Sequence, residues 1–280
     1  MRVKYNFSSK LTQKTRKPSH TNKHSVAFPK QAREVIRTSD IILEVLDARF
    51  IDKTRNLQLE AEAKNAGKKL IFVLNKADLI DIKNLKISYD LSSMKPYVLF
   101  STKSKIGRTR LRQLVNIEAK KTDFNKARVG VIGYPNTGKS SVINVLSGGK
   151  RAGTSSQAGF TKTIQKIRFN KDIIILDSPG VIFSGEENSL MGNIVKRHVE
   201  TGAKDYGKVK HPDFIINDIM KQHKKIFDNF YGVDSHEDSE NLLEILGKKW
   251  NLLEKGGIVD KDRTARRILK NWQEGKIKIN

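Results

Sequence analysis

The chain has 280 residues, 37% of them hydrophobic, which is enough for one α/β domain and a smaller second unit. It has no cysteine, which excludes disulfides and thiolate metal sites, and no apolar run near the roughly 18 residues of a membrane span. No apolar stretch follows Met1, so a secretory signal is not expected, and we predict a cytoplasmic, monomeric protein.

The net charge of +24 favours a polyanionic partner, because each cation set against a phosphate releases a counterion. The charge is uneven: lysines and arginines are frequent before Glu34, and no acidic residue precedes it. We therefore predict that residues 1–24 form a flexible basic arm that orders on nucleic acid. A lysine-rich solvated surface is the alternative explanation of the charge.

From Asp40 onward, short apolar and β-branched segments alternate with helix-like segments such as residues 56–66 and 108–118. The predicted strands are residues 41–46, 70–74, 97–100, 129–132, 164–169 and 173–176. Several are apolar almost throughout, as in parallel strands covered on both faces. The alternation of strands and helices indicates a doubly wound α/β sheet.

Residues 75–78 read Asn-Lys-Ala-Asp and follow the predicted strand 70–74. A buried carboxylate at Asp78 can accept hydrogen bonds from guanine N1–H and from the guanine 2-amino group together. Adenine lacks the amino group and has no proton on N1, so Asp78 would stay unpaired against it. An unpaired buried charge gives strong discrimination, although a four-residue motif is weak evidence alone.

The neighbouring polar residues are expected to complete this base site. Asn75 would brace the loop, and the stem of Lys76 would lie over the base. The segment after the predicted strand 97–100, namely Ser101, Thr102 and Lys103, is a looser candidate for backbone contact with the guanine oxygen.

Residues 133–140 read Gly-Tyr-Pro-Asn-Thr-Gly-Lys-Ser, between the predicted strand 129–132 and an apolar stretch. This strand–loop–helix context is what a phosphate-binding loop requires, because its glycines let successive N–H groups point at phosphate oxygens. We predict that Lys139 bridges the β- and γ-phosphates and that Ser140 holds Mg²⁺ through its hydroxyl. The expected nucleotide contacts are Asn136, Thr137, Gly138, Lys139, Ser140 and Ser141.

Residues 177–180 read Asp-Ser-Pro-Gly and close the predicted strand 173–176. Asp177, beside the phosphate loop, can hold Mg²⁺ through water, and the Gly180 N–H can sense the γ-phosphate. Thr161, in the loop between the two phosphate motifs, is expected to complete the Mg²⁺ shell. Lys139, Thr161 and Gly180 are therefore the predicted catalytic residues.

After about Val181 the pattern changes to helices only, with apolar stripes that we expect to pack as a core. The stripes comprise Ile216, Ile219, Met220, Phe227, Phe230, Leu242, Leu246, Trp250, Leu253, Ala265, Ile268, Leu269 and Trp272. Asp260 can cap the start of the last helix and Gly275 its end.

The last helix also has a cationic face opposite its apolar stripe. At spacings i, i+3, i+4 and i+7 this face carries Arg263, Arg266, Arg267 and Lys270. A helix that is apolar on one side and cationic on the other suits docking on phosphates, so we predict RNA contacts here. A solvated face is the alternative.

The order of these motifs is rotated, because the base motifs at residues 75 and 101 precede the phosphate motifs at residues 133, 161 and 177. In this order the chain resembles the circularly permuted GTPases, specifically the YlqF/RbgA (YawG-type) family linked to assembly of the large ribosomal subunit. The match extends to Asp-Ala-Arg at residues 47–49 and to the glycines and arginines of residues 256–276. It covers roughly residues 28–278.

The resemblance implies a circularly permuted P-loop G domain at residues 25–185 and a smaller all-α RNA-binding domain at residues 186–280. A G domain moves most where its loops touch the γ-phosphate. Here the loop after Asp177 runs directly into the helical domain, so we expect loss of the γ-phosphate to re-aim that domain.

Catalysis is less complete in the sequence than binding. Val181 stands where many GTPases have the glutamine that orients water, so we expect slow intrinsic hydrolysis that a partner stimulates. Bacterial members of the family carry Phe-Pro-Gly-His-Met, whose histidine is implicated in catalysis, whereas residues 28–32 read Phe-Pro-Lys-Gln-Ala. The residue that orients water is therefore left open, with His20 and His24 upstream as minor candidates. Asn136 matches the asparagine of potassium-activated GTPases, so K⁺ joins Mg²⁺ as an expected cofactor.

The favoured function is a GTPase that docks on ribosomal RNA of the large subunit with GTP and is released by hydrolysis. A second hypothesis keeps the GTPase but directs it to another RNA or to a protein receptor. A third is a passive RNA-binding protein with an inactive phosphate loop.

Overall fold

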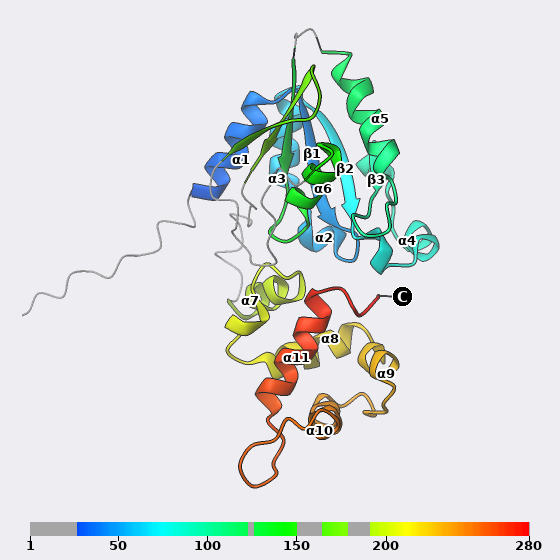
Figure 1. The fold of residues 1–280 in the computed structure, drawn as a ribbon, viewed down its shortest axis with the longest axis vertical. Helices are drawn as coiled ribbons and strands as arrows, with labels where there is room; N and C mark the ends of the chain where they lie inside the picture. The colour runs from blue at the N-terminus through cyan, green and yellow to red at the C-terminus, as the bar shows by residue number, and fades with distance from the viewer. Residues whose placement is uncertain (1–26, 123–125, 150–163, 179–190, 280) are drawn as a thin grey trace, which may run out of the picture.

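The computed structural model describes residues 27–122, 126–149, 164–178 and 191–279. Within these ranges a six-stranded sheet carries helices on both faces, and a group of helices lies below the sheet in Figure 1. The predicted basic arm lies outside the described residues. No helix in the described segments combines the length and the apolar character that crossing a membrane requires.

The strands confirm the predicted doubly wound sheet, with small shifts at their ends. They are β1 (Ile41–Asp47), β2 (Lys69–Asn75), β3 (Tyr97–Leu99), β4 (Ala127–Ile132), β5 (Gln165–Arg168) and β6 (Ile173–Asp177). Their order is β3-β2-β1-β4-β6-β5, and all neighbours are parallel except β5 and β6. β5 returns antiparallel because only a short turn joins it to β6, whereas a parallel return needs a crossover of about a dozen residues.

In the part of the chain before β5 that the structure describes, six α-helices accompany the strands. They are α1 (Ala27–Thr38), α2 (Ile51–Thr54), α3 (Leu57–Asn65), α4 (Ile82–Ser88), α5 (Arg108–Ala119) and α6 (Lys139–Leu146). The predicted helices at residues 56–66 and 108–118 are confirmed as α3 and α5. The side chain of Asn56 caps α3 by accepting a hydrogen bond from Leu59 N at 3.0 Å.

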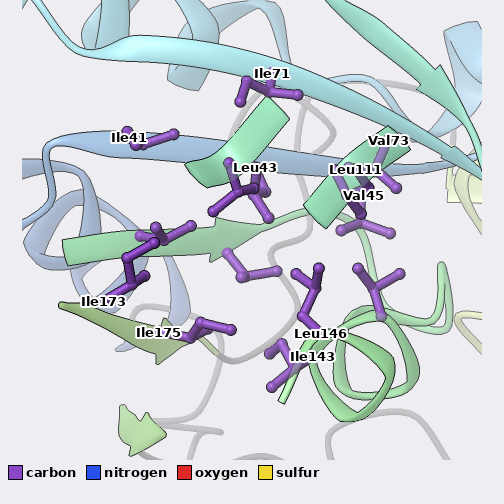
Figure 2. Packing of buried hydrophobic residues seen from close by; sticks show 14 of the residues in the cluster. Ile41, Leu43, Val45, Ile71, Val73, Leu111, Ile143, Leu146, Ile173 and Ile175 are labelled. Carbon is purple, nitrogen blue, oxygen red and sulfur yellow. The ribbon is translucent and has the colours of Figure 1, made fainter. Parts of the chain in front are cut away.

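The two faces of the sheet bury alternate residues of the same strands. Leu43 of β1 packs with Leu111 of α5 and Ile143 of α6, and Figure 2 shows this cluster. Ile42, one position earlier, faces the opposite side, where α1 and α3 cover the sheet. The strand β4 is covered in this way on both faces. The phosphate loop follows the carboxyl end of β4 and leads into α6.

Gly130 of β4 lets α1 lie close to the sheet. A Cβ here would lie 2.5 Å from Ser39 Oγ and 2.6 Å from Val35 Cγ1. We expect Gly130→Ala to lower the free energy of unfolding by about 1–3 kcal/mol, because α1 must move outward. Denaturant unfolding measures the loss. The control is Gly149→Ala, where an added Cβ meets nothing within 4 Å, and equal stability of the two variants would contradict this packing.

The second group of helices confirms the predicted all-α part. It contains α7 (Met191–Glu200), α8 (Pro212–Gln222), α9 (Ile226–Tyr231), α10 (Ser239–Lys249) and α11 (Lys261–Gln273). Trp272 is fully buried at its centre, with ring centroids 6.0 Å from Phe227 and 5.9 Å from Phe50. Because Phe50 follows β1, the helical core extends to the sheet part of the chain.

The prediction of a packed core is wrong for two residues of the apolar stripes. Phe230 is 41% exposed and Leu253 is 40% exposed. Phe230 lies near the end of the short helix α9, where its neighbour Tyr231 takes the inward position against Trp250, with ring centroids 5.3 Å apart. The predicted cap of α11 is confirmed, since Asp260 Oδ1 accepts a hydrogen bond from Arg263 N at 2.8 Å.

Candidate functional site

The loop of residues 133–138 leads from β4 into α6, as its sequence predicts. Gly138 precedes α6 with a φ of 94°, and a Cβ at this position would collide with Asn75 Nδ2. Asn75 Nδ2 donates a hydrogen bond to the carbonyl oxygen of Thr137 at 2.7 Å. Asn75 therefore joins the loop after β2 to the loop after β4, and a glycine is needed for this close approach.

Lys139 begins α6 and is buried, with Nζ donating to the carbonyl oxygens of Gly133 at 3.1 Å and Tyr134 at 3.0 Å. Asp177 ends β6, the neighbour of β4, and its Oδ2 accepts a hydrogen bond from Ser140 Oγ at 3.4 Å. The two phosphate-type motifs therefore meet at the carboxyl edge of the sheet, with an ammonium group, a hydroxyl and a carboxylate together.

The ionisable groups at this edge are poorly solvated. Burial lowers the pKa of Lys139 to about 8, although attraction to Asp177 opposes the shift. Burial raises the pKa of Asp177 to about 6, against the opposite influence of Lys139 and Ser140. A phosphate beside Lys139 and a cation beside Asp177 would each favour the charged form.

The donor set at this edge fits a hydrated Mg²⁺. Asp177 Oδ1 is buried and has no hydrogen-bond partner among the described residues. Mg²⁺ is bound through one or two protein oxygens, waters and phosphate oxygens, so Asp177 with the Ser140 hydroxyl suits it. The described part of the chain holds no cluster of three His, Cys, Asp or Glu residues that would suit another metal.

Lys76 begins the loop after β2, which we call the base loop, and its φ of 62° turns the chain sharply there. Asp78 Oδ1 accepts a hydrogen bond from Ser101 Oγ at 2.6 Å, so the two predicted base motifs are brought together. The expectation that Asp78 is buried is wrong: the residue is half-buried, because it lines an open cleft.

The second base segment forms a tight turn around a buried hydroxyl. Ser101 Oγ accepts hydrogen bonds from Lys103 N at 3.1 Å and Ser104 N at 3.0 Å while it donates to Asp78. Ser101 therefore orients the carboxylate of Asp78, and Thr102 and Lys103 lie on the wall of the cleft.

The cleft between the sheet part and the helical part has a volume of about 410 Å³. From the predicted motifs it is lined by Asn75, Lys76, Asp78, Thr102, Lys103, Asn136, Gly138 and Ser141. From the helical part it is lined by Thr201, Gly202, Asp205, Tyr206, Gln273, Glu274 and Gly275. The sequence pattern predicted the first set as nucleotide contacts, and no periodicity or motif placed the second set in this cleft.

The structure also contains a buried charge network beside the base loop that the sequence analysis did not predict. Asp47 Oδ2 lies 2.8 Å from Arg49 Nη2 and 2.7 Å from Lys76 Nζ. Burial alone would raise the pKa of Asp47, but attraction from Arg49 and Lys76 outweighs it and holds the pKa well below its usual range. The available signal was an Asp directly at the end of a buried strand, since such a group needs a cationic partner.

Of the remaining predicted site residues, the structure describes Asn136 and leaves three undescribed. Asn136, the predicted K⁺ ligand, donates from Nδ2 to the carbonyl oxygen of Gly202 in the helical part. Thr161, Gly180 and Val181 lie outside the described residues.

On the cationic face of α11, Arg266 differs from the other three cations because contacts within the chain hold its guanidinium. Its guanidinium pairs with Asp262 at 2.6 Å and donates to the carbonyl oxygens of Tyr206, Gly207 and Val209 at 2.9–3.0 Å. Arg266 therefore ties α11 to the preceding loop. Arg263 and Lys270 are exposed, and so is Arg267, whose guanidinium lies 4.4 Å from the ring centroid of Trp250.

Comparison with known proteins adds independent information. Residues 128–205 match a family described as 50S ribosome-binding GTPase. The uncharacterized GTP-binding protein MJ1464 of Methanocaldococcus jannaschii is 39% identical, over 90% of this chain and 66% of that protein. Nucleolar GTP-binding protein 2 of Saccharomyces cerevisiae is 34% identical, over 87% of this chain and 51% of that protein.

The fold has a counterpart among solved structures. GNP-bound YlqF from T. maritima matches 90% of this chain and 97% of its own, with a TM-score of 0.62 and 23% identity. The chain spans about half to two thirds of the length of the two curated relatives.

Proposed function

The chain belongs to the YlqF-type family of circularly permuted GTPases, and on that premise we propose that it binds GTP with Mg²⁺ and hydrolyses it to GDP and phosphate. The observation that carries the proposal is the 2.7 Å hydrogen bond from Asn75 to Thr137, which joins loops 62 residues apart. Both loops face one cleft of about 410 Å³, a size that suits a small ligand.

Each motif has a separate task in this proposal. The backbone N–H groups of the phosphate loop, other than at Pro135, which has none, and the Lys139 ammonium bind the β- and γ-phosphates, while Asp78 reads the guanine edge. Ser140 and Asp177 hold Mg²⁺, which supplies positive charge against the phosphate oxygens when bound. The Thr161 hydroxyl completes the Mg²⁺ shell, and the Gly180 N–H donates to the γ-phosphate.

Hydrolysis in this proposal is slow without a partner. Phosphoryl transfer depends on positioning and charge stabilisation, and Val181 has no polar group to orient water. A partner that completes the site raises such rates by roughly 10³–10⁵. K⁺ held beside Asn136 would add charge at the same place, and equal rates in K⁺ and Na⁺ would exclude it.

The nucleotide proposal is tested by measuring the affinity of the purified protein for GTP and ATP in the presence of Mg²⁺. We expect clear preference for GTP and loss of binding in Lys139→Ala. Equal affinity for GTP and ATP would contradict the proposed guanine-specific site. Lys139→Ala with intact nucleotide binding and intact cellular function would instead favour the passive RNA-binding protein.

For the partner, we propose that the monomer acts in the cytoplasm and docks on RNA of the large ribosomal subunit in its GTP form. The net charge of +24 and the exposed cations of α11, which are Arg263, Arg267 and Lys270, support a phosphate-rich surface. Sedimentation with ribosomal particles tests this, because nucleotide-dependent comigration with the large subunit is expected. Its absence would favour another RNA or a protein receptor.

Replacing the three exposed cations of α11 measures their share of RNA binding. We expect Arg263→Gln/Arg267→Gln/Lys270→Gln to weaken RNA binding about tenfold at about 0.15 M salt, and to reduce the slope of log affinity against log salt by about two to three. The control triple, Lys210→Gln/Lys221→Gln/Lys255→Gln, removes the same charge from exposed positions outside α11. Equal losses in both triples would mean that only net charge matters.

A further inference from the structure

The helical part supplies one wall of the candidate nucleotide cleft. Thr201 and Gly202 follow α7, Asp205 and Tyr206 lie in the next turn, and Glu274 ends α11, yet all of them line the cleft with the base and phosphate motifs. A nucleotide bound there would therefore contact both parts of the chain. Figure 1 shows that the helical part lies below the sheet part.

This wall is held directly against the loop that would read the base. Ile279 N donates to the carbonyl oxygen of Leu79 at 3.1 Å, one residue after Asp78. Gly275, at the end of α11, approaches the same leucine so closely that a Cβ would lie 2.5 Å from Leu79 Cδ1. The base loop and the end of α11 therefore fix each other's positions.

Of the two carboxylates on this wall, Asp205 and Glu274, Asp205 is the one without an ion pair among the described residues. Gln273 accepts from Tyr206 N and donates to two carbonyl oxygens, and Glu274 pairs with Lys276 at 2.8 Å. Asp205 accepts a hydrogen bond from Gly207 N at 2.8 Å and has no ion pair among the described residues. A carboxylate has about four acceptor positions, so most of its capacity remains.

The covalent structure of a nucleotide decides what this carboxylate would meet. With the base at Asp78 and the phosphates at Lys139, the ribose must lie between them in the cleft. Its two hydroxyls are donors, and a carboxylate is the acceptor that proteins use for ribose hydroxyls. We propose that Asp205 accepts hydrogen bonds from the ribose, so that the helical part selects ribonucleotides over deoxyribonucleotides. This inference rests on the proposed GTP binding.

The test compares the affinities of the purified 280-residue protein for GTP, 2′-deoxyGTP and 3′-deoxyGTP, measured by titration calorimetry with Mg²⁺. The variant is Asp205→Asn, which keeps one oxygen for Gly207 N and loses the charge and the second oxygen. The matched control is Asp234→Asn, an exposed carboxylate elsewhere in the helical part. We expect wild type and Asp234→Asn to prefer GTP over at least one deoxy analogue by about tenfold. In Asp205→Asn we expect this ratio to fall close to one with the affinity for that analogue unchanged.

Two results would overturn the inference. Wild-type protein that binds all three nucleotides equally would show that no group reads the ribose. An Asp205→Asn variant that loses affinity for GTP and both analogues by the same factor would show a structural role only. In either case a retained preference for GTP over ATP would leave the proposed function standing, whereas equal GTP and ATP affinities would remove both.

Discussion

Asp78→Asn is expected to lower the affinity for GTP by about two to three orders of magnitude and to create a preference for xanthosine triphosphate. Guanine presents two donors, N1–H and the 2-amino group, to the two oxygens of Asp78. Asparagine offers one acceptor and one donor, so one pair becomes donor against donor. Xanthine has N1–H and an oxygen at position 2, which match asparagine. Competition of each nucleotide against a fluorescent GDP analogue measures the change.

Ser101 makes the expected effect of Asp78→Asn large. Its hydroxyl holds Asp78 Oδ1 at 2.6 Å, so the side chain at this position cannot easily turn away from the base. Asp81→Asn is the control, because Asp81 caps α4 three residues later with the same carboxylate chemistry and asparagine caps a helix equally well. An Asp78→Asn protein that still prefers GTP would show that another group reads the base.

The sheet was predictable because its strands are short, β-branched and buried on both faces, which leaves little ambiguity with helices. The antiparallel return of β5 could also be deduced from the few residues between it and β6. The helix α1 was missed, since it carries Pro29 in its first turn and a mixed sequence, and its packing depends on Gly130 in a strand far along the chain.

The site was predictable where a motif carries its own geometry. Residues 75–78 and 133–140 each follow a strand, and parallel strands bring such loops to one edge of the sheet. Arg266 shows the limit of this reasoning. It lies on the same face of α11 as Arg263 and Lys270. However, the carbonyl groups that bind its guanidinium belong to a loop about 60 residues away in the sequence. Periodicity identifies a face of a helix and says nothing about what lies against it.

The contacts across the cleft are beyond sequence reasoning for the same reason. Gly202 offers only a backbone carbonyl to Asn136, and Ile279 offers only a backbone N–H to Leu79. Backbone groups are present at every position, so no residue type marks them. The network around Asp47 is different, because an acid at the end of a buried strand demands a cation and could have been sought.

Asp47→Asn is expected to cost about 3–5 kcal/mol of the free energy of unfolding, measured by urea denaturation at neutral pH. The substitution keeps the shape of the side chain but leaves the Arg49 guanidinium, whose side chain is 1% exposed, as a buried charge without its carboxylate. Glu34→Gln is the matched control, since it breaks an exposed pair with Arg37 and should change the stability far less. Equal costs in the two variants would show that burial adds nothing to the Asp47 pair.

The pH dependence of the same variant checks the cause. The folded-state pKa of Asp47 is lowered, so its stabilisation is present in full above the unfolded pKa of about 4 and is lost as the pH falls toward the folded pKa. The stability difference between wild type and Asp47→Asn should therefore be constant near neutrality and shrink in acid. A difference that stays constant down to the acid limit would mean that packing, and not the charge of Asp47, holds the network together.

Arg49 Nη1 also donates to the carbonyl oxygen of Trp272 at 3.2 Å, and Lys76 belongs to the base loop. The same substitution should therefore weaken both GTP binding and the attachment of α11, whereas Glu34→Gln should change neither.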